Sequence, residues 1–369
     1  AGLEPGAKVA IYSYNRPEYL IGQFGALKAR MCPVNVNYRY LETELAYIID
    51  NSDAEAVIFE SSFAPRVAAI RDQIPQVKVF LEICDGQAPQ LEGAVAFGSA
   101  MTDPDPMPVI ERSSSDIYMI YTGGTTGNPK GVLYSHRSTL LHTYATIMPD
   151  ALGISSSDVI MPIVPMFHVN AWGNPYACPV AGAKMVMPGA KMGDGATLAA
   201  LINEEGVTMS AGVPTVWLNL LNHLRSSGER IESLNRVIVG GSACPLSVME
   251  EFDTYGVDTR HAWGMTEMSP LGTANSAGAN RAQFSDEEFA KIRSNVGTPV
   301  FGVEVKITDD DNNALPWDGK AFGALKVRGP WICSSYFKLD GSDAHAEPGW
   351  FETGDVATIS PDGYVSITD

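Results

Sequence analysis

The densest set of residues able to do chemistry lies in residues 121–131, which read Y-T-G-G-T-T-G-N-P-K-G. Glycine frees the backbone so that successive N–H groups can converge on one anion. Threonine hydroxyls add further donors, and one lysine adds a full positive charge. We therefore predict a phosphate-binding loop, whose donors come from Thr122, Gly123, Gly124, Thr125, Thr126, Gly127, Lys130 and Gly131.

The loop is flanked by apolar residues 117–120 and 132–133, which predict a strand on each side. It is not a Walker A loop, because Asn128 and Pro129 separate Gly127 from Lys130, where Walker A has Gly-Lys-Ser/Thr. The alternative is a surface turn that happens to be rich in glycine and threonine.

A second stretch, residues 263–267, reads W-G-M-T-E. Thr266 offers a hydroxyl to a phosphate, and Glu267 offers the hard oxygen ligand that Mg²⁺ prefers. A Thr-Glu pair standing alone would more simply be a helix cap.

Two further stretches could touch a nucleotide. Asp355 ends the segment G-W-F-E-T-G-D, and its two acceptor oxygens suit a ribose diol, although such an aspartate is also ordinary turn chemistry. Gly240, Gly241 and Ser242 follow apolar residues 237–239 and form a strand-end loop without side-chain bulk. Ligands bind at such strand ends in open α/β sheets, although the glycines could equally mark only a tight turn.

In this chain order, the loop and the W-G-M-T-E stretch resemble the adenylate-forming superfamily of acyl-CoA synthetases, luciferases and peptide-synthetase adenylation domains. One departure is Gly123, where the family usually has serine. The resemblance implies that the phosphate loop and Lys130 hold pyrophosphate, Thr266 the α-phosphate, Glu267 the Mg²⁺ and Asp355 the ribose. It also implies that the loop with Gly240, Gly241 and Ser242 flanks the adenine and the acyl group. Further cofactor-binding residues would be Ala262, Trp263, Gly264 and Met265.

The segment 166–172, M-F-H-V-N-A-W, bears on the substrate. A lone His168 among apolar residues is ordinarily a core histidine, but in the resembled family this position borders the carboxylate pocket and the path of the thiol. Peptide-synthetase domains place an Asp after the Phe to pair with an ammonium, whereas His168 and Val169 follow Phe167 here. Because burying an unpaired ammonium is costly, an amino-acid substrate is disfavoured.

The family resemblance therefore implies an ATP-dependent ligase that activates a fatty or related apolar acid to an acyl-adenylate and then forms a CoA thioester. Its catalytic residues would be Lys130, His168, Thr266 and Glu267, with ATP, Mg²⁺ and coenzyme A as cofactors. Within the family, the segments around Trp172, Trp217 and Trp263 look most like medium-chain fatty acid and methylmercaptopropionate CoA ligases. Two alternatives stay open: a domain loading a carrier protein, and a nucleotide-binding protein without catalysis.

Composition limits the partners and the compartment. The 25 basic and 43 acidic residues give a net charge of −18, so the surface should repel nucleic acid and anionic membranes. The five cysteines show no C-x-x-C pair, which favours reduced thiols in a cytoplasmic protein. The uncharged run 159–183 contains four prolines and is interpreted as protein interior rather than a membrane span. A homodimer stays open.

Strand-like and helix-like segments alternate through most of the chain, which predicts an α/β fold with parallel sheets. We expect two αβ subdomains in residues 1–296, carrying the ATP and acyl sites, and a small β-barrel-like subdomain in residues 297–369. By resemblance, this is the large N-terminal domain of an adenylate-forming enzyme. The chain begins without Met, and its C-terminal lid would follow residue 369, so we expect a fragment of low activity.

Overall fold

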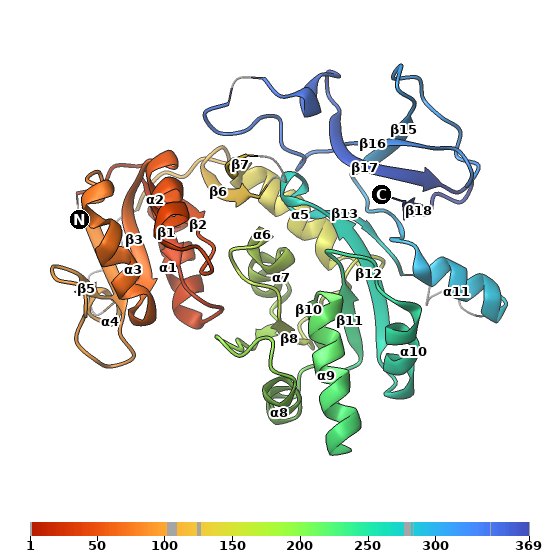
Figure 1. Cartoon of the computed structure of the whole chain (residues 1–369), viewed down its shortest axis with the longest axis horizontal. Helices are drawn as coiled ribbons and strands as arrows, with labels where there is room; N and C mark the ends of the chain where they lie inside the picture. Colours follow the sequence, from red (N-terminus) through yellow and green to blue (C-terminus); the bar gives the residue numbers. More distant parts are fainter. Residues whose placement is uncertain are drawn as a thin grey trace. The chain divides into compact units, whose positions relative to one another are not determined.

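The computed structural model describes residues 2–101, 109–123, 127–276, 282, 284–339 and 341–368. Its contacts divide the chain into two compact units, which are described one at a time (Figure 1). Unit 1 comprises Ala1–Arg137, Pro165–Asn170 and Tyr336–Lys338, and unit 2 comprises Ser138–Val164, Ala171–Ser335 and Leu339–Asp369.

Unit 1 is built on a seven-stranded sheet with the order β5-β4-β3-β1-β2-β6-β7. Every neighbouring pair is parallel except β6 and β7, which form an antiparallel pair. The strands are β1 (Lys8–Tyr12), β2 (Cys32–Asn35), β3 (Ala54–Glu60), β4 (Val79–Ile83), β5 (Val95–Ala96), β6 (Ile117–Thr122) and β7 (Lys130–Ser135).

Helices cover both faces of this sheet, as the continuous apolar runs of its strands require (Figure 1). Ala10 and Tyr12 of β1 belong to a core cluster with residues of α2 and α3, whereas Ile58 of β3 packs beside Gly22 of α1 on the opposite face. The helices of this unit are α1 (Pro17–Lys28), α2 (Glu42–Asn51), α3 (Ala64–Ile70) and α4 (Phe97–Ala100), with helical turns at Ser61–Phe63 and Arg71–Gln73.

Unit 2 contains a second seven-stranded sheet with the order β14-β13-β12-β11-β10-β8-β9. The strands from β9 to β12 are parallel neighbours, and β13 and β14 are added antiparallel. Their bounds are β8 (Val159–Pro162), β9 (Lys184–Met185), β10 (Met209–Gly212), β11 (Arg236–Val239), β12 (Asp258–Gly264), β13 (Leu271–Ala274) and β14 (Thr298–Pro299).

Several helices of unit 2 follow the apolar spacing of the sequence. The clearest example is α9, which buries Trp217, Leu220, Leu221 and Leu224 on one face and ends at Gly228 with a φ of 76°. The helices are α5 (His136–Ile147), which begins in unit 1, α6 (Val169–Trp172), which is shared between the units, α7 (Asn174–Ala181), α8 (Gly195–Glu205), α9 (Pro214–Ser227), α10 (Leu246–Thr254) and α11 (Asp286–Ser294).

A third, four-stranded antiparallel sheet completes unit 2, with strands β15 (Glu304–Thr308), β16 (Phe322–Arg328), β17 (Phe351–Ile359) and β18 (Val365–Ile367). This β-rich region and the two parallel sheets confirm the predicted fold class. The register of β16 and β17 shifts between Ala324 and Lys326, and Gly354 has a φ of 83°. The Thr-Gly-Asp segment, for which ordinary turn chemistry was the alternative to a ribose contact, is therefore an irregularity inside a strand.

Several elements were not predicted, including β12, β13, α10 and α11. The residues after Glu267 are rich in Ser, Gly and Asn, a composition that favours a loop, yet Leu271–Ala274 forms a buried strand. Within the described residues, no helix is long and apolar enough to cross a membrane. The division into residues 1–296 and 297–369 stays a prediction.

Candidate functional site

The loop predicted to bind phosphate, called the phosphate loop below, connects β6 to β7 in unit 1, and Thr122 lies opposite Lys130 in their ladder. Tyr121 Oη donates a 2.6 Å hydrogen bond to Asn51, and Tyr47 Oη donates to Pro129 O at 3.1 Å, so residues around α2 fix both sides of the loop. Gly127 has a φ of 99°, a conformation that favours glycine. Gly124, Thr125 and Thr126 lie outside the described residues.

Lys130 is exposed, and its Nζ lies 5.0 Å from the centroid of the Tyr336 ring in the same unit. Phe337 N donates to Gly131 O at 2.8 Å, next to a bridge between Val132 and Tyr336. A Cβ on Gly131 would lie only 2.9 Å from Met119 Sδ. Gly131 is thus required for close packing, while Lys130 keeps its ammonium available to an anion.

The W-G-M-T-E stretch of unit 2 forms a tight corner. Strand β12 ends at Gly264, a helical turn spans Thr266–Met268, and β13 returns antiparallel. A Cβ on Gly264 would lie 2.0 Å from Pro270 O, so no other residue fits without moving the backbone. Thr266 and Glu267 are 6% and 4% exposed, and Glu267 O accepts a 2.7 Å hydrogen bond from Cys333 N.

A cleft of about 460 Å³ lies in unit 2, a size typical of small-molecule sites. It brings together stretches that are far apart in the sequence: the strand-end loop after β11, the end of β12, and β17. The predicted site residues that line it are Gly241, Ser242, Ala262, Trp263, Gly264, Met265 and Asp355.

Three predicted residues of unit 2 do not line this cleft. A Cβ on Gly240 would lie 2.9 Å from Ala262 O and 3.2 Å from Trp172 Cη2, so this glycine allows packing beneath the strand-end loop. Thr266 and Glu267 follow the cleft residue Met265 directly, but they are buried in the corner.

Asp355 is the carboxylate of the cleft. Trp263 Nε1 donates a 2.8 Å hydrogen bond to Oδ2 of Asp355, and no hydrogen bond to Oδ1 is found among the described residues. Burial raises the pKa of Asp355 above its ordinary value of 3.8, while the Trp263 bond lowers that pKa. The side chain is thus oriented by Trp263 and retains an acceptor for a ligand hydroxyl.

Some cleft residues were not predicted. They are His261, Ser294, Asn295 and Val296 beside the strand ends, and Ser366, Ile367 and Thr368 at β18. Burial lowers the pKa of His261, so its imidazole is held neutral. His261 directly precedes the predicted Ala262, which was a usable signal, but the sequence alone offered none for the other residues.

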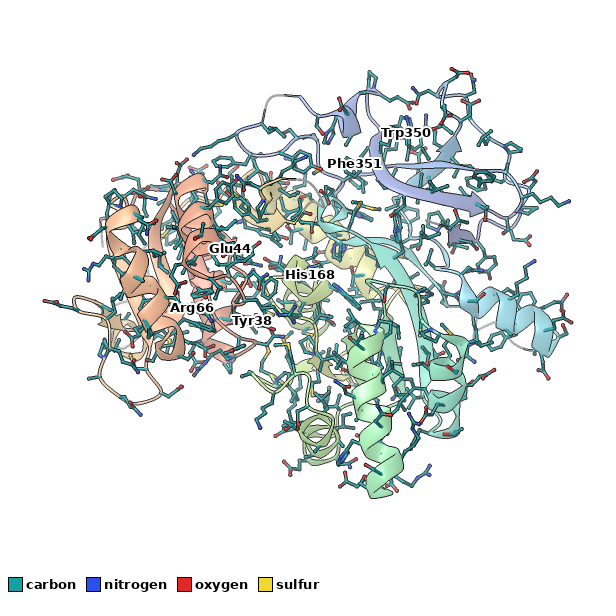
Figure 2. All side chains as sticks on the ribbon, in the orientation of Figure 1. Tyr38, Glu44, Arg66, His168, Trp350 and Phe351 are labelled. Carbon is teal, nitrogen blue, oxygen red and sulfur yellow. The ribbon has the colours of Figure 1, made fainter. Side chains whose placement is uncertain are left out.

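The segment around His168 belongs to unit 1, although it lies between two parts of unit 2 in the sequence. The Phe167 ring packs edge-on against Tyr38 with centroids 5.0 Å apart, and Figure 2 labels Tyr38 and His168. His168 is exposed, but the protein atoms around its ring still displace part of its water, which lowers its pKa, and the nearby positive charge of Arg39 lowers that pKa further. His168 is therefore a neutral imidazole near neutral pH, able to accept or donate one hydrogen bond.

The backbone after His168 is unusual. Val169, Asn170, Ala171 and Trp172 have φ values of 48°, 50°, 44° and 59°, so α6 is a left-handed turn. Such a conformation costs roughly 1–2 kcal/mol per non-glycine residue, and it is rare for a β-branched or bulky side chain. Strain of this kind persists only where surrounding contacts enforce it, and it is concentrated at functional sites.

These features suit a nucleotide and Mg²⁺. The cleft offers a tryptophan, a loop without side-chain bulk and a carboxylate acceptor, which match an adenosine. Among the described residues, no group of three or more His, Cys, Asp or Glu could hold a metal ion. A single carboxylate such as Glu267, together with substrate phosphates, is a usual environment for Mg²⁺.

Comparisons with known proteins agree with this chemistry. The sequence profile described as "AMP-binding enzyme" matches residues 1–337. A 3-methylmercaptopropionyl-CoA ligase of Ruegeria lacuscaerulensis is 45% identical over 375 residues, which cover 100% of this chain and 69% of the relative. A medium-chain-fatty-acid–CoA ligase of Ectopseudomonas oleovorans is 42% identical, covering 100% of this chain and 68% of the relative.

Among solved structures, the N-terminal domain of FACL13 from Mycobacterium tuberculosis superposes with a TM-score of 0.84 at 23% identity. The match covers 100% of this chain and 87% of that domain, and at this identity it supports the fold alone. The predicted resemblance is confirmed by the profile and the curated relatives. The chain belongs to the family of AMP-binding enzymes, among its acyl-CoA ligases.

Proposed function

We propose that this protein uses ATP to convert an apolar carboxylic acid into an acyl-adenylate and then transfers the acyl group to coenzyme A. The observation that supports this most directly is the cleft of unit 2. Its lining joins Gly241 and Ser242, Trp263 and Met265, and Asp355, which belong to three separate stretches of the chain. We assign the adenosine to this cleft, with Asp355 accepting hydrogen bonds from the ribose diol.

The chemistry requires charge stabilisation. A carboxylate is a poor electrophile, so it must first attack the α-phosphorus of ATP and expel pyrophosphate. Negative charge builds up during this step, and preorganised donors lower its barrier. We assign the pyrophosphate to the loop from Thr122 to Lys130 and the α-phosphate to Thr266. Bound Mg²⁺ would neutralise phosphate charge, and we assign it to Glu267.

The acid is proposed to be a medium-length alkyl or thioether-bearing acid. Two relatives at 42–45% identity are named for such acids, a medium-chain fatty acid and 3-methylmercaptopropionate. Phe167 is followed by His168 and Val169, so this position supplies no carboxylate to pair with the ammonium of an amino acid. A neutral His168 also places no fixed positive charge in this segment.

The test is AMP release by the full-length protein across a panel of acids from acetate to palmitate, with methylmercaptopropionate and several amino acids, each with and without CoA. We expect CoA-dependent AMP release that peaks at one chain length and is absent for amino acids. AMP release without CoA would indicate another acyl acceptor, and silence across the panel would overturn the proposal.

A separate variant tests the assignment of Mg²⁺ to Glu267. Glu267→Gln keeps the shape of the side chain and removes its charge, so we expect the Mg²⁺ concentration at half-maximal rate to rise. Glu250→Gln, on the exposed face of α10, is the matched control. An equal Mg²⁺ requirement in both variants would show that Glu267 does not bind the metal.

A further inference from the structure

Four amide side chains meet around the segment that carries Phe167 and His168. Asn15 Oδ1 accepts a 2.7 Å hydrogen bond from Met166 N, and Asn35 Nδ2 donates to Met166 O at 3.1 Å. Asn35 Nδ2 also donates to Asn170 Oδ1 at 2.6 Å, and Gln23 Nε2 donates to the same oxygen at 2.9 Å. Both ends of the segment from Met166 to Asn170 are therefore held.

The amides come from the framework of unit 1 rather than from the segment itself. Asn15 follows strand β1, Gln23 lies in α1, and Asn35 is the last residue of β2. Asn15 and Gln23 are fully buried, and Asn35 and Asn170 are 3% and 2% exposed. The ends of two neighbouring parallel strands and one helix thus converge on a segment more than 130 residues away in the sequence.

Stability alone gives little reason for this arrangement. Buried hydrogen bonds add little net stability over well-packed apolar groups, but they fix direction and register. Here they fix a backbone amide, a backbone carbonyl and the side chain of Asn170, immediately where the left-handed turn begins. An arrangement of this kind holds Phe167 and His168 between two fixed points.

We propose that Asn15, Gln23 and Asn35 form an amide clamp that positions Phe167 and His168 for binding and transfer of the acyl group. This inference rests on the proposed function. The three clamp residues are positioning residues, because they act through the segment they hold. Loss of the clamp should misplace the segment by a fraction of an ångström or more, which can cost roughly 100-fold in rate.

Substitutions at Asn170 distinguish the effect of losing its side-chain hydrogen bonds from the effect of its strained backbone conformation. Asn170→Asp keeps an acceptor for both donors and tolerates the left-handed conformation. Asn170→Gly relieves the backbone strain but removes the acceptor. We expect Asn170→Asp to stay within about threefold of the wild type in KM for the acid, and Asn170→Gly to raise that KM roughly tenfold or more.

Gln23→Leu removes one of the two hydrogen-bond donors to Asn170 Oδ1. It should also raise KM for the acid, with KM for ATP unchanged. The matched control is Val57→Ala, which removes core volume in unit 1 away from the segment. It should lower the melting temperature without changing either KM. Amide hydrogen exchange in a peptide containing Met166 gives a readout independent of activity, and it should accelerate in Gln23→Leu but not in Val57→Ala.

Two results would overturn the clamp: KM values for the acid that are unchanged in Gln23→Leu and Asn170→Gly, or an equal defect in Asn170→Asp and Asn170→Gly. An inactive full-length wild type would instead overturn the proposed function. Even without activity, an unchanged rate of amide hydrogen exchange at Met166 in Gln23→Leu would overturn the clamp.

Discussion

The phosphate loop of unit 1 and the W-G-M-T-E corner of unit 2 both depend on glycine, but in opposite ways. A Cβ on Gly123 or Gly127 would meet no atom within 4 Å. A Cβ on Gly264 would lie 2.0 Å from Pro270 O, and one on Gly272 would lie 2.4 Å from Met268 Cε. Gly123 and Gly127 thus border open space, whereas Gly264 and Gly272, like Gly131 at the far end of the loop, let neighbouring chain segments approach each other.

This contrast matches the different tasks predicted for the two stretches. A loop that wraps an anion needs free N–H groups and room for the ligand. A corner that holds the side chains of Trp263 and Thr266 in fixed orientations needs a rigid backbone, which close packing provides. We therefore expect substitutions in the loop to affect function more than stability, and substitutions in the corner to affect both.

The largest effect should come from Gly264→Ala. The new methyl group would collide with backbone atoms, so the free energy of unfolding should fall by about 3 kcal/mol and activity should be lost. Urea denaturation measures the change. Gly25→Ala is the control, because that helical glycine has nothing within 4 Å of its Cβ and the substitution should stabilise α1 by about 0.5–1 kcal/mol. Equal stability of both variants would contradict the contrast.

Lys130→Ala should leave the free energy of unfolding within about 0.5 kcal/mol of the wild type, because Lys130 is exposed. Activity should fall roughly 10- to 100-fold in kcat/KM for ATP, since a charged hydrogen bond to phosphate is lost. Lys184→Ala, which removes an exposed lysine paired with Glu205, should change neither quantity. Wild-type kinetics in Lys130→Ala would remove this residue from the phosphate site.

Trp263→Phe probes the electrostatics of the corner. It removes the hydrogen bond that lowers the pKa of Asp355, so burial should raise that pKa further. The proposed ribose contact needs a carboxylate acceptor, so ATP affinity should fall as the pH drops through the pKa of Asp355. In the variant this loss should begin at a higher pH. Calorimetric titrations of ATP at several pH values measure the shift, and superimposable pH profiles would refute it.

Gly123→Ser should have the smallest effect. Gly123 has room for a side chain, and serine is the residue that the family usually has there. We expect an unchanged free energy of unfolding and a change in KM for ATP of about threefold or less. The same substitution at Gly264 should unfold the corner. A strong loss of stability in Gly123→Ser would show that the loop is as closely packed as the corner.

The sequence predicted the alternating strands and helices well, because the apolar runs of parallel strands and the 3.6-residue spacing of α8 and α9 are local signals. It also predicted the fold class and the family. It did not predict β13, because Leu271–Ala274 contains glycine, threonine and alanine, and its burial depends on neighbouring strands.

The candidate site also has features that the sequence predicts and features that depend on long-range contacts. Trp263, Gly264 and Asp355, which line the cleft, could be named from the sequence because each lies in a short motif whose residue types suit one ligand group. The hydrogen bond from Trp263 to Asp355 could not be predicted, since the two residues are 92 positions apart. The left-handed turn of Val169–Trp172 was also hidden, because none of its residues is glycine.

The sequence by itself thus determined the types of groups available: N–H, hydroxyl and ammonium donors around Lys130, and carboxylate oxygens at Glu267 and Asp355. Only the tertiary structure decided which of them meet and in what orientation. Residue types and local spacing are set by the chain, whereas the cleft lining and the amide contacts of Asn170 depend on strand order and on packing between distant segments. Those long-range contacts leave no short-range pattern in the sequence.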